Sequence, residues 1–361
     1  MLIRLDLADG VVPALSERHI AALDNIGLSA FCGYHLVIGS RATLKALAEE
    51  PRLSLRAKAA YRAVLNRAAE LGSIQRAIRS RIDVSVEAIE VSLNGGVWSV
   101  PLTYFAEPFV LAPPEILCEN LTDAKFYYEL GRWYGWHSRL RALSFFALPR
   151  GAGGSAIADE LRERVAQGQP FTLCIVDSDR KYPGGPVGDT ARRARERLPS
   201  DLWFIRLLIL DLREVENLLP HAWLTKTQSG SQNAVVCEHR HAVQSRQLIF
   251  LAGYVDVKSG YSACQLLKSR IAGVRECARR ELSELASEAV SLKDCLAADE
   301  CAHDVPCFAV AGLGEALMNQ VVKFLESAPS VQTKEVIGNE RLKSLALRVF
   351  EWGVAAQKFR A

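Results

Sequence analysis

The sequence predicts an α/β fold in which a mainly parallel sheet is flanked by helices, with an N-terminal α+β module and a helical C-terminal region. Short apolar runs at 116–118, 172–176 and 207–210 alternate with stretches of helical length, as in a parallel sheet. Beyond residue 260 the apolar residues follow helical spacing. We therefore expect three parts, at 1–110, 111–262 and 263–361.

Composition sets broad limits on the class of protein. The chain has 361 residues, of which 49% are hydrophobic, enough for a sizeable core in two or three domains. The net charge of +3 is lower than that of most dedicated nucleic-acid binders. No signal sequence or membrane-length apolar run is apparent, and the nine scattered cysteines suggest reduced thiols. We expect a cytoplasmic protein without a membrane partner.

The N-terminal module mixes predicted helices and strands. Residues 36–39 are expected to form a strand and 41–49 a helix, followed by a longer basic helix at 54–79. The Asn94-Gly95 pair predicts a hairpin within 84–103. The module carries no catalytic motif, so docking and nucleic-acid positioning both stay open as its role.

Acidic residues follow two of the apolar runs. Glu119 comes after the run at 116–118, and Asp177 and Asp179 follow the run at 172–176. The carboxyl ends of parallel strands meet at one edge of a sheet, where open α/β folds build their sites. Three acids at one edge suggest a divalent metal.

The order of elements between these acids is informative. A predicted helix at 124–140, with Thr122 or Asp123 as its N-cap, leads to an apolar run at 142–148. A glycine turn at 151–154 and a helix at 157–166 then precede the Asp-Ser-Asp segment. The order is thus strand-Glu, helix, strand-Gly-Gly, helix, strand-Asp-x-Asp.

This layout resembles the Toprim domain of topoisomerases, bacterial primases, certain ribonuclease maturases and OLD-family nucleases. The likeness covers roughly residues 113–260, and its motifs are short. It implies that Glu119 matches the acid/base glutamate of the family and that Asp177 and Asp179 match its magnesium-binding pair.

Two later segments extend the resemblance. Glu216-Asn217, after the run at 207–210, looks like the equivalent segment of OLD-like nucleases and of Toprim effectors in bacterial anti-phage systems. The resemblance implies that Glu216, or Glu214 as an alternative, completes a second metal site. Lys258 follows a predicted strand at 247–255 and by the same resemblance would stabilise charge on a phosphate oxygen.

Such a set of side chains suits phosphodiester hydrolysis. This reaction needs an activated water and neutralised charge at phosphorus, which two Mg²⁺ ions about 4 Å apart supply. Carboxylates are hard oxygen ligands that Mg²⁺ accepts, with Mn²⁺ as an alternative. The chain has neither a His-Glu-x-x-His motif nor a phosphate-binding P-loop, so zinc proteolysis and P-loop nucleotide hydrolysis lose their usual support.

Two further clusters of charged or metal-ligating residues stand out in the sequence. A basic group after the Asp-Ser-Asp segment is expected to hold a phosphate backbone, with an ordinary basic helix face as the alternative. It comprises Arg180, Lys181, Arg192, Arg193 and Arg195. A cysteine and histidine cluster lacks the usual knuckle spacing, so structural zinc is not expected there. It comprises Cys295, Cys301, His303 and Cys307.

Simpler roles stay open for the site residues. Glu119 could cap a helix or end a strand in a salt bridge, Glu216 could be structural, and Lys258 could be a solvated surface residue. Asp-x-Asp also occurs in dehalogenase-like and receiver-like folds, but these place the leading aspartate on the first strand of the domain. Helices expected at 264–292, 315–327 and 340–359 could pack on the core, line a groove or form a homo-oligomer face.

The sequence thus predicts a Mg²⁺-dependent Toprim endonuclease that cleaves DNA or RNA as an effector of anti-phage defence. One alternative is an RNA-processing or tRNA-cleaving nuclease outside defence. Another is a non-catalytic Toprim-like binding or sensor module that works with a partner ATPase, since the chain has no ATPase motif of its own.

Overall fold

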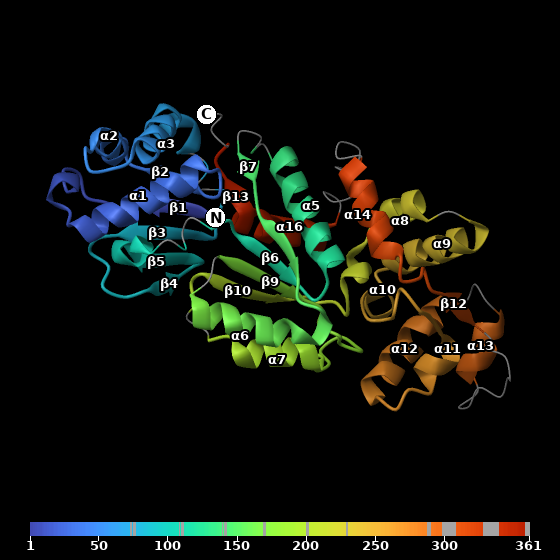
Figure 1. The fold of residues 1–361 in the computed structure, drawn as a ribbon. Helices are drawn as coiled ribbons and strands as arrows, with labels where there is room; N and C mark the ends of the chain where they lie inside the picture. Colours follow the sequence, from blue (N-terminus) through green and yellow to red (C-terminus); the bar gives the residue numbers. More distant parts are fainter. Residues whose placement is uncertain are drawn as a thin grey trace. The chain divides into compact units, whose positions relative to one another are not determined.

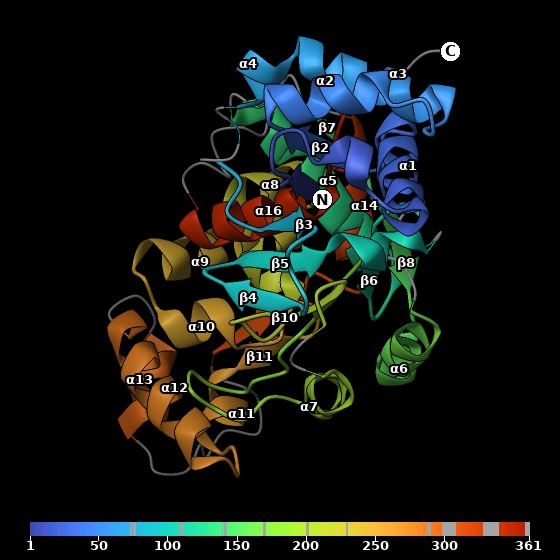
Figure 2. The same cartoon turned by 90° about the vertical axis from the view of Figure 1, so that its left-hand side faces the viewer.

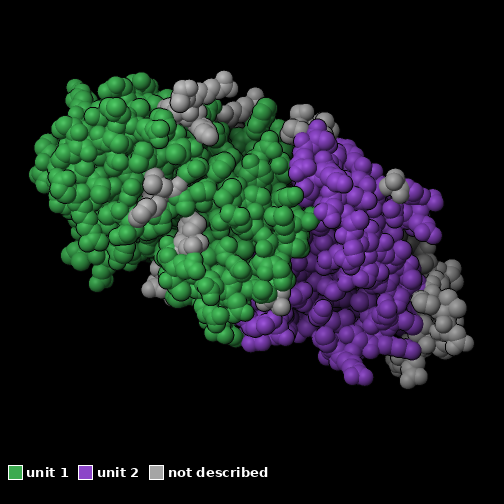
Figure 3. Space-filling view, in the orientation of Figure 1, with its two compact units in different colours: residues 1–174, 196–208, 343–361 green, residues 175–195, 209–342 purple. Residues whose placement is uncertain are grey.

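In the computed structural model the chain forms two compact units, coloured separately in Figure 3. Unit 1 consists of residues 1–174, 196–208 and 343–361, and unit 2 of residues 175–195 and 209–342. Neither unit is continuous in sequence, and the division passes through strand β9. The structure describes residues 1–72, 74, 77–107, 109, 112–138, 140, 143–168, 171–199, 202–228, 230–286, 290–297, 308–327 and 339–357.

Unit 1 begins with a five-stranded sheet in the order β2-β1-β3-β5-β4, part of which is seen in Figure 2. Its strands are β1 (Leu2–Leu5), β2 (Leu36–Gly39), β3 (Arg81–Ser85), β4 (Ser92–Asn94) and β5 (Val97–Pro101). Its helices are α1 (Glu17–Phe31), α2 (Arg41–Glu49), α3 (Leu55–Asn66) and α4 (Ala68–Leu71), with the 3₁₀ turns η1 (Val12–Ala14) and η3 (Leu102–Ala106).

This sheet differs in one respect from the expected α+β module. The β1–β2, β1–β3 and β3–β5 pairs are parallel, and only β4–β5 is antiparallel, so the arrangement is α/β. The cause is that helices connect β1 to β2 and β2 to β3, and such crossovers produce parallel neighbours. The predicted hairpin at Asn94-Gly95 is confirmed, because Gly95 and Gly96 adopt positive φ values of 58° and 89° between β4 and β5.

A second sheet has the order β10-β9-β6-β8. Its strands are β6 (Glu115–Cys118), β8 (Leu148–Gly151), β9 (Thr172–Val176) and β10 (Ile205–Ile209). β6 is parallel to both β8 and β9, and β6 and β9 are buried throughout, which confirms the mainly parallel sheet. Figure 1 shows α5 (Leu121–His137) and α16 (Glu340–Gly353) on one side of this sheet and α6 (Ile157–Gln167) on the other.

The start of α5 differs from the expectation. Its N-cap is Asn120, whose side chain accepts a hydrogen bond from the Asp123 backbone N–H at 2.9 Å, so neither Thr122 nor Asp123 has this role. The helix therefore begins at Leu121, earlier than expected. Asn is one of the best N-cap residues, which accounts for its role at this position.

Unit 2 is mostly helical. It contains most of α7 (Asp189–Arg197), the 3₁₀ turn η6 (Val215–Leu218), α8 (His221–Thr227), α9 (Ser231–Ser245), α10 (Ile249–Gly253), α11 (Ala263–Leu267), α12 (Ala272–Leu285), α13 (Val290–Ala297) and α14 (Leu317–Ser327). A short antiparallel pair joins β11 (Gly260–Ser262) to β12 (Ala309–Ala311). The helix expected over 264–292 is thus broken into shorter helices.

The prediction of a strand at 247–255 is wrong, because this apolar run contains helix α10. The buried carboxylate of Glu281 accepts hydrogen bonds from the Phe250 and Leu251 backbone N–H groups, both at 2.9 Å. These two groups lie at the start of α10 and have no partner within a helix. A contact with a residue about thirty positions away therefore favours helix over strand.

The C-terminal helix also ends earlier than expected. α16 stops at Gly353, and β13 (Val354–Ala355) then pairs antiparallel with β7 (Ser144–Phe145). A Cβ atom on Gly353 would lie 2.3 Å from the Phe145 ring, so only glycine permits this close approach. None of the helices in the described part of the chain combines the length and the apolar character that crossing a membrane requires.

Glu351 on α16 gives a pH-dependent contribution to the stability of unit 1. Its buried carboxylate accepts hydrogen bonds from the backbone N–H groups of Arg79, at 2.6 Å, and Ser80, at 3.3 Å. Burial raises its pKa above the ordinary value of 4.5, against the opposing effect of these bonds. Above pH 4.5 the folded state therefore binds more protons than the unfolded state, and stability falls as the pH rises through the raised pKa.

We expect Glu351→Gln, which keeps the carbonyl acceptor, to remove this part of the pH dependence. Urea unfolding between about pH 4 and 8 measures the free energy of unfolding at each pH. This free energy should fall less with rising pH in Glu351→Gln than in wild type. Glu326→Gln, on an exposed part of α14, is the matched control. Equal pH slopes for wild type and Glu351→Gln would contradict the assignment.

Candidate functional site

The predicted site residues are divided between the two units. Glu119 directly follows β6 and belongs to unit 1. Asp177 and Asp179 follow β9 and belong to unit 2, as do Glu216 and Lys258.

In unit 1 the glycine turn folds over the end of β6. The Ala152 backbone N–H donates to the Cys118 carbonyl at 2.9 Å, and the Gly154 N–H donates to the Glu119 carbonyl at 2.8 Å. A Cβ atom on Gly151 would lie 2.6 Å from the Leu121 nitrogen, so a larger residue would separate the turn from the start of α5. The turn thus fixes the backbone at Glu119, while Asn120 caps the helix.

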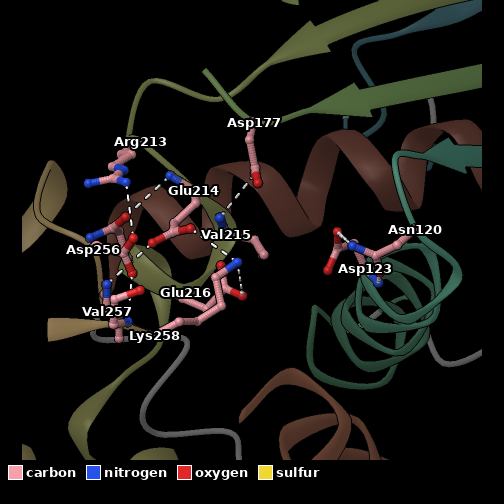
Figure 4. Close-up of polar contacts among 12 residues, drawn as sticks. Asn120, Asp123, Asp177, Arg213, Glu214, Val215, Glu216, Asp256, Val257 and Lys258 are labelled. Carbon is pink, nitrogen blue, oxygen red and sulfur yellow. Dashed lines mark hydrogen bonds and ion pairs between the residues drawn. The ribbon is translucent and has the colours of Figure 1, made fainter. Parts of the chain in front are cut away.

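In unit 2 the Asp-Ser-Asp segment is bound to the segment that follows β10. Asp177 Oδ1 accepts from the Val215 N–H at 3.1 Å, as drawn in Figure 4. Ser178 Oγ donates to the Leu212 carbonyl at 2.6 Å, and the Asp179 N–H donates to the Arg213 carbonyl at 2.9 Å. Three hydrogen bonds therefore set the position of both aspartates relative to this segment.

Asp179 has an uncommon backbone conformation. Its φ angle is +53°, in the left-handed region, which aspartate tolerates better than most residues. Gly188 packs against it, since its N–H donates to the Ser178 carbonyl at 2.7 Å and a Cβ there would lie 2.4 Å from the Asp179 Cβ. Backbone strain of this kind is concentrated at functional sites.

Lys258 lies between two buried carboxylates. Its Nζ is 3.2 Å from Glu214 Oε2 and 3.3 Å from Glu216 Oε1. Figure 4 draws the side chains of all three residues. The Glu214 and Glu216 side chains are only 9% and 4% exposed, so a water-screened surface pair is ruled out. Burial lowers the pKa of Lys258, but the charges of Glu216 and Glu214 outweigh this effect and hold the pKa above its ordinary value of 10.5.

Three further residues, which no sequence motif indicated, complete this charged cluster. Arg213 Nη2 donates to Asp256 Oδ2 at 3.1 Å. Asp256 Oδ1 in turn accepts from the Ser259 N–H at 2.8 Å, which shapes the turn carrying Lys258. The third is Arg240, which is 5% exposed and interacts electrostatically with Glu214 and Glu216. The sequence offered one signal for Asp256, since it is an acidic residue only two positions before Lys258.

The predicted basic cluster lies in unit 2. Arg192, Arg193 and Arg195 are exposed on α7, whose buried side is formed by Ala191 and Ala194. Arg192 also pairs with Asp189 at 2.8 Å, and this hydrogen bond lowers the pKa of Asp189. Of the other two residues, Lys181 is exposed and Arg180 is half-buried.

The fit to a divalent metal is partial. Asp177 and Asp179 offer the oxygen ligands that Mg²⁺ prefers. Within the described ranges, however, no three His, Cys, Asp or Glu side chains form a group that could hold a metal ion. Glu214 and Glu216 already contact an ammonium group.

The cysteines in the described part of the chain are of two kinds. Cys32, Cys118, Cys174, Cys237 and Cys277 are thiols that form no disulfide, as expected from the sequence. Cys264 and Cys295 are disulfide-bonded, which differs from the expectation of reduced thiols. In the cysteine and histidine cluster where structural zinc was not expected, Cys301, His303 and Cys307 lie outside the described residues.

Comparisons with protein-family models, with curated proteins and with solved structures find no match for this chain.

The ion pairs of Lys258 predict a large effect on stability. Lys258→Met would leave two buried carboxylates without their ammonium, and loss of one partner from a buried pair costs about 3 kcal/mol. We expect urea unfolding to show a loss of this order. Lys323→Met, at an exposed position on α14, should change stability by about 0.5 kcal/mol or less. Equal stability of the two variants would mean that the pairs contribute little.

Proposed function

We propose that this chain is a Mg²⁺-dependent endonuclease of the Toprim type that hydrolyses phosphodiester bonds in DNA or RNA, as an effector of bacterial anti-phage defence. The observation that supports it is the charged cluster of unit 2. There the Asp177–Asp179 segment, which follows a parallel strand, is hydrogen-bonded to the Glu214–Glu216 segment, and Lys258 contacts both glutamates. Open α/β sheets bind ligands at the carboxyl ends of their strands.

Each residue has a distinct role in this proposal. Asp177 and Asp179 would hold Mg²⁺, which when bound supplies positive charge to a phosphate and lowers the pKa of a water. Lys258 brings a fixed positive charge that can face a phosphate oxygen. Glu119, in unit 1, is assigned as general base or metal ligand by the resemblance alone. The resemblance alone would give Glu216 a second-site metal role, but its carboxylate contacts the Lys258 ammonium at 3.3 Å.

A second candidate is a non-catalytic binding or sensor module that works with a partner ATPase. The specific observation in its favour is that the described residues contain no group of three potential ligands. An inactive Toprim-like core could keep its charged cluster as an internal network of ion pairs. The two candidates differ in whether the aspartates are needed for bond cleavage.

Cleavage assays separate these candidates. Plasmid, single-stranded DNA and total tRNA are incubated with the protein and Mg²⁺ or Mn²⁺. We expect wild type to cut at least one of them, and Glu119→Ala and Asp177→Ala to reduce the rate by about 100-fold or more, as for loss of an acid/base group or metal ligand. Preference for tRNA would favour the RNA-directed alternative.

The matched controls are Asp159→Ala in unit 1 and Glu326→Ala in unit 2, both exposed acids that should leave cleavage unchanged. If wild type cuts and the Glu119 and Asp177 variants cut equally well, the site assignment is wrong. If no substrate is cut, with or without a partner ATPase, the binding module is supported instead.

The α7 arginines predict a salt-dependent interaction with nucleic acid. Replacing Arg192, Arg193 and Arg195 together by alanine should weaken DNA or RNA binding and reduce the slope of log K against log salt by up to about 2–3, because each phosphate contact releases a counterion. Fluorescence anisotropy at several salt concentrations measures this slope. A triple variant of scattered exposed residues, Arg18→Ala, Lys45→Ala and Lys323→Ala, changes the net charge equally. Equal slopes for both triple variants would rule out α7 as the phosphate-binding face.

A further inference from the structure

The Glu214 and Glu216 carboxylates need a positive partner because both are buried. Two like charges close together and shielded from water repel each other, and each loses hydration. The Lys258 ammonium lies 3.2 and 3.3 Å from their oxygens and contacts both at once. It is thus in the position that a bridging cation between two carboxylates would take.

The backbone that carries Lys258 is held in place from two sides. On one side Glu214 Oε1 accepts from the Val257 N–H at 3.3 Å. On the other, the Leu313 N–H donates to the Val257 carbonyl and the Gly314 N–H to the Lys258 carbonyl, both at 3.0 Å. Gly312 allows this approach, since a Cβ there would lie 1.8 Å from the Lys258 carbonyl oxygen. The ammonium is therefore delivered to the glutamates by a fixed segment.

Arg240 is a second buried cation that interacts with Glu214 and Glu216. Arg240 on α9 is buried, and Glu214 and Glu216 both raise its pKa, against the larger lowering effect of burial. Its Nη2 donates to the Ala252 carbonyl at 3.4 Å, on the same stretch of chain that leads to Lys258. Two carboxylates thus lie near two cations, which leaves little net negative charge to attract a divalent ion.

We propose that Lys258 is the resident cation of the Glu214–Glu216 pair, and that this pair becomes a divalent-cation site only when the ammonium is removed. The proposal builds on the proposed nuclease function and deepens it, since Lys258 would take the place of the second metal ion there. Carboxylate oxygens are ligands that Mg²⁺ and Mn²⁺ accept together with waters. Lys258 is 27% exposed, so water and an incoming ion can reach the pair once the side chain is shortened.

The test is a count of bound Mn²⁺ without nucleic acid, from the electron paramagnetic resonance signal of free Mn²⁺ during a titration. We expect Lys258→Met to bind one Mn²⁺ more than wild type. Lys323→Met, which makes the same charge change on an exposed part of α14, should bind as many as wild type. The double variant Lys258→Met with Glu216→Gln should lose the additional ion.

Two results would overturn the proposal. The first is equal Mn²⁺ binding by wild type and by folded Lys258→Met. The second uses Glu216→Gln alone, which keeps Lys258 and does not depend on Lys258→Met folding. If this variant binds one Mn²⁺ fewer than wild type, Glu216 is already a metal ligand and Lys258 is not the resident cation. Because no substrate is present, failure of the cleavage assays would not alter either outcome.

Discussion

Two buried carboxylates, Glu214 and Glu216, determine how the centre of unit 2 is built. Burying like charges is unfavourable unless cations accompany them, and Lys258 and Arg240 come from segments far away in sequence. The chain must therefore bring α9 and the turn after α10 to the short helix η6. Asn217 on η6 stabilises this arrangement. Its side-chain amide donates hydrogen bonds to the carbonyls of Ala252, at 3.1 Å, and Val255, at 3.2 Å, in the segment that leads to Lys258.

The same segment positions the aspartates. Leu212, Arg213 and Val215 each exchange one hydrogen bond with the Asp177–Asp179 stretch, through two carbonyls and one N–H. Disturbing the charge balance at Glu214 and Glu216 would therefore also shift the backbone that holds Asp177. The left-handed conformation of Asp179 is tolerated because these bonds and the close packing of Gly188 leave it few alternatives.

Local patterns in the sequence predicted local structure well. The α2 helix has the expected bounds because Ser40 caps it and apolar residues follow at helical spacing. The order strand, helix, strand, helix, strand from β6 to β9 was also predicted, but β8 lies at Leu148–Gly151 and not in the apolar run at 142–148, which contains the short strand β7. The failures have long-range causes. The run at 247–255 is apolar enough for a strand, but the Glu281 carboxylate on α12 accepts hydrogen bonds from the first N–H groups of α10 and so stabilises a helix. The spacing of residues likewise gave no sign that Lys258 pairs with Glu214 and Glu216, more than forty positions earlier.

The chemistry available to such a site follows from what an ammonium group can and cannot do. Lys258 can neutralise charge and donate hydrogen bonds, and it remains in place at any metal concentration because it is part of the chain. It has no open coordination position, so it cannot bind a water and lower its pKa as a metal ion does. In a phosphodiester reaction Lys258 therefore suits a phosphate or leaving oxygen. Activation of the water would fall to a carboxylate or to an ion held by the aspartates, which is why Asp177 and Asp179 matter more than Glu216 for the proposed activity.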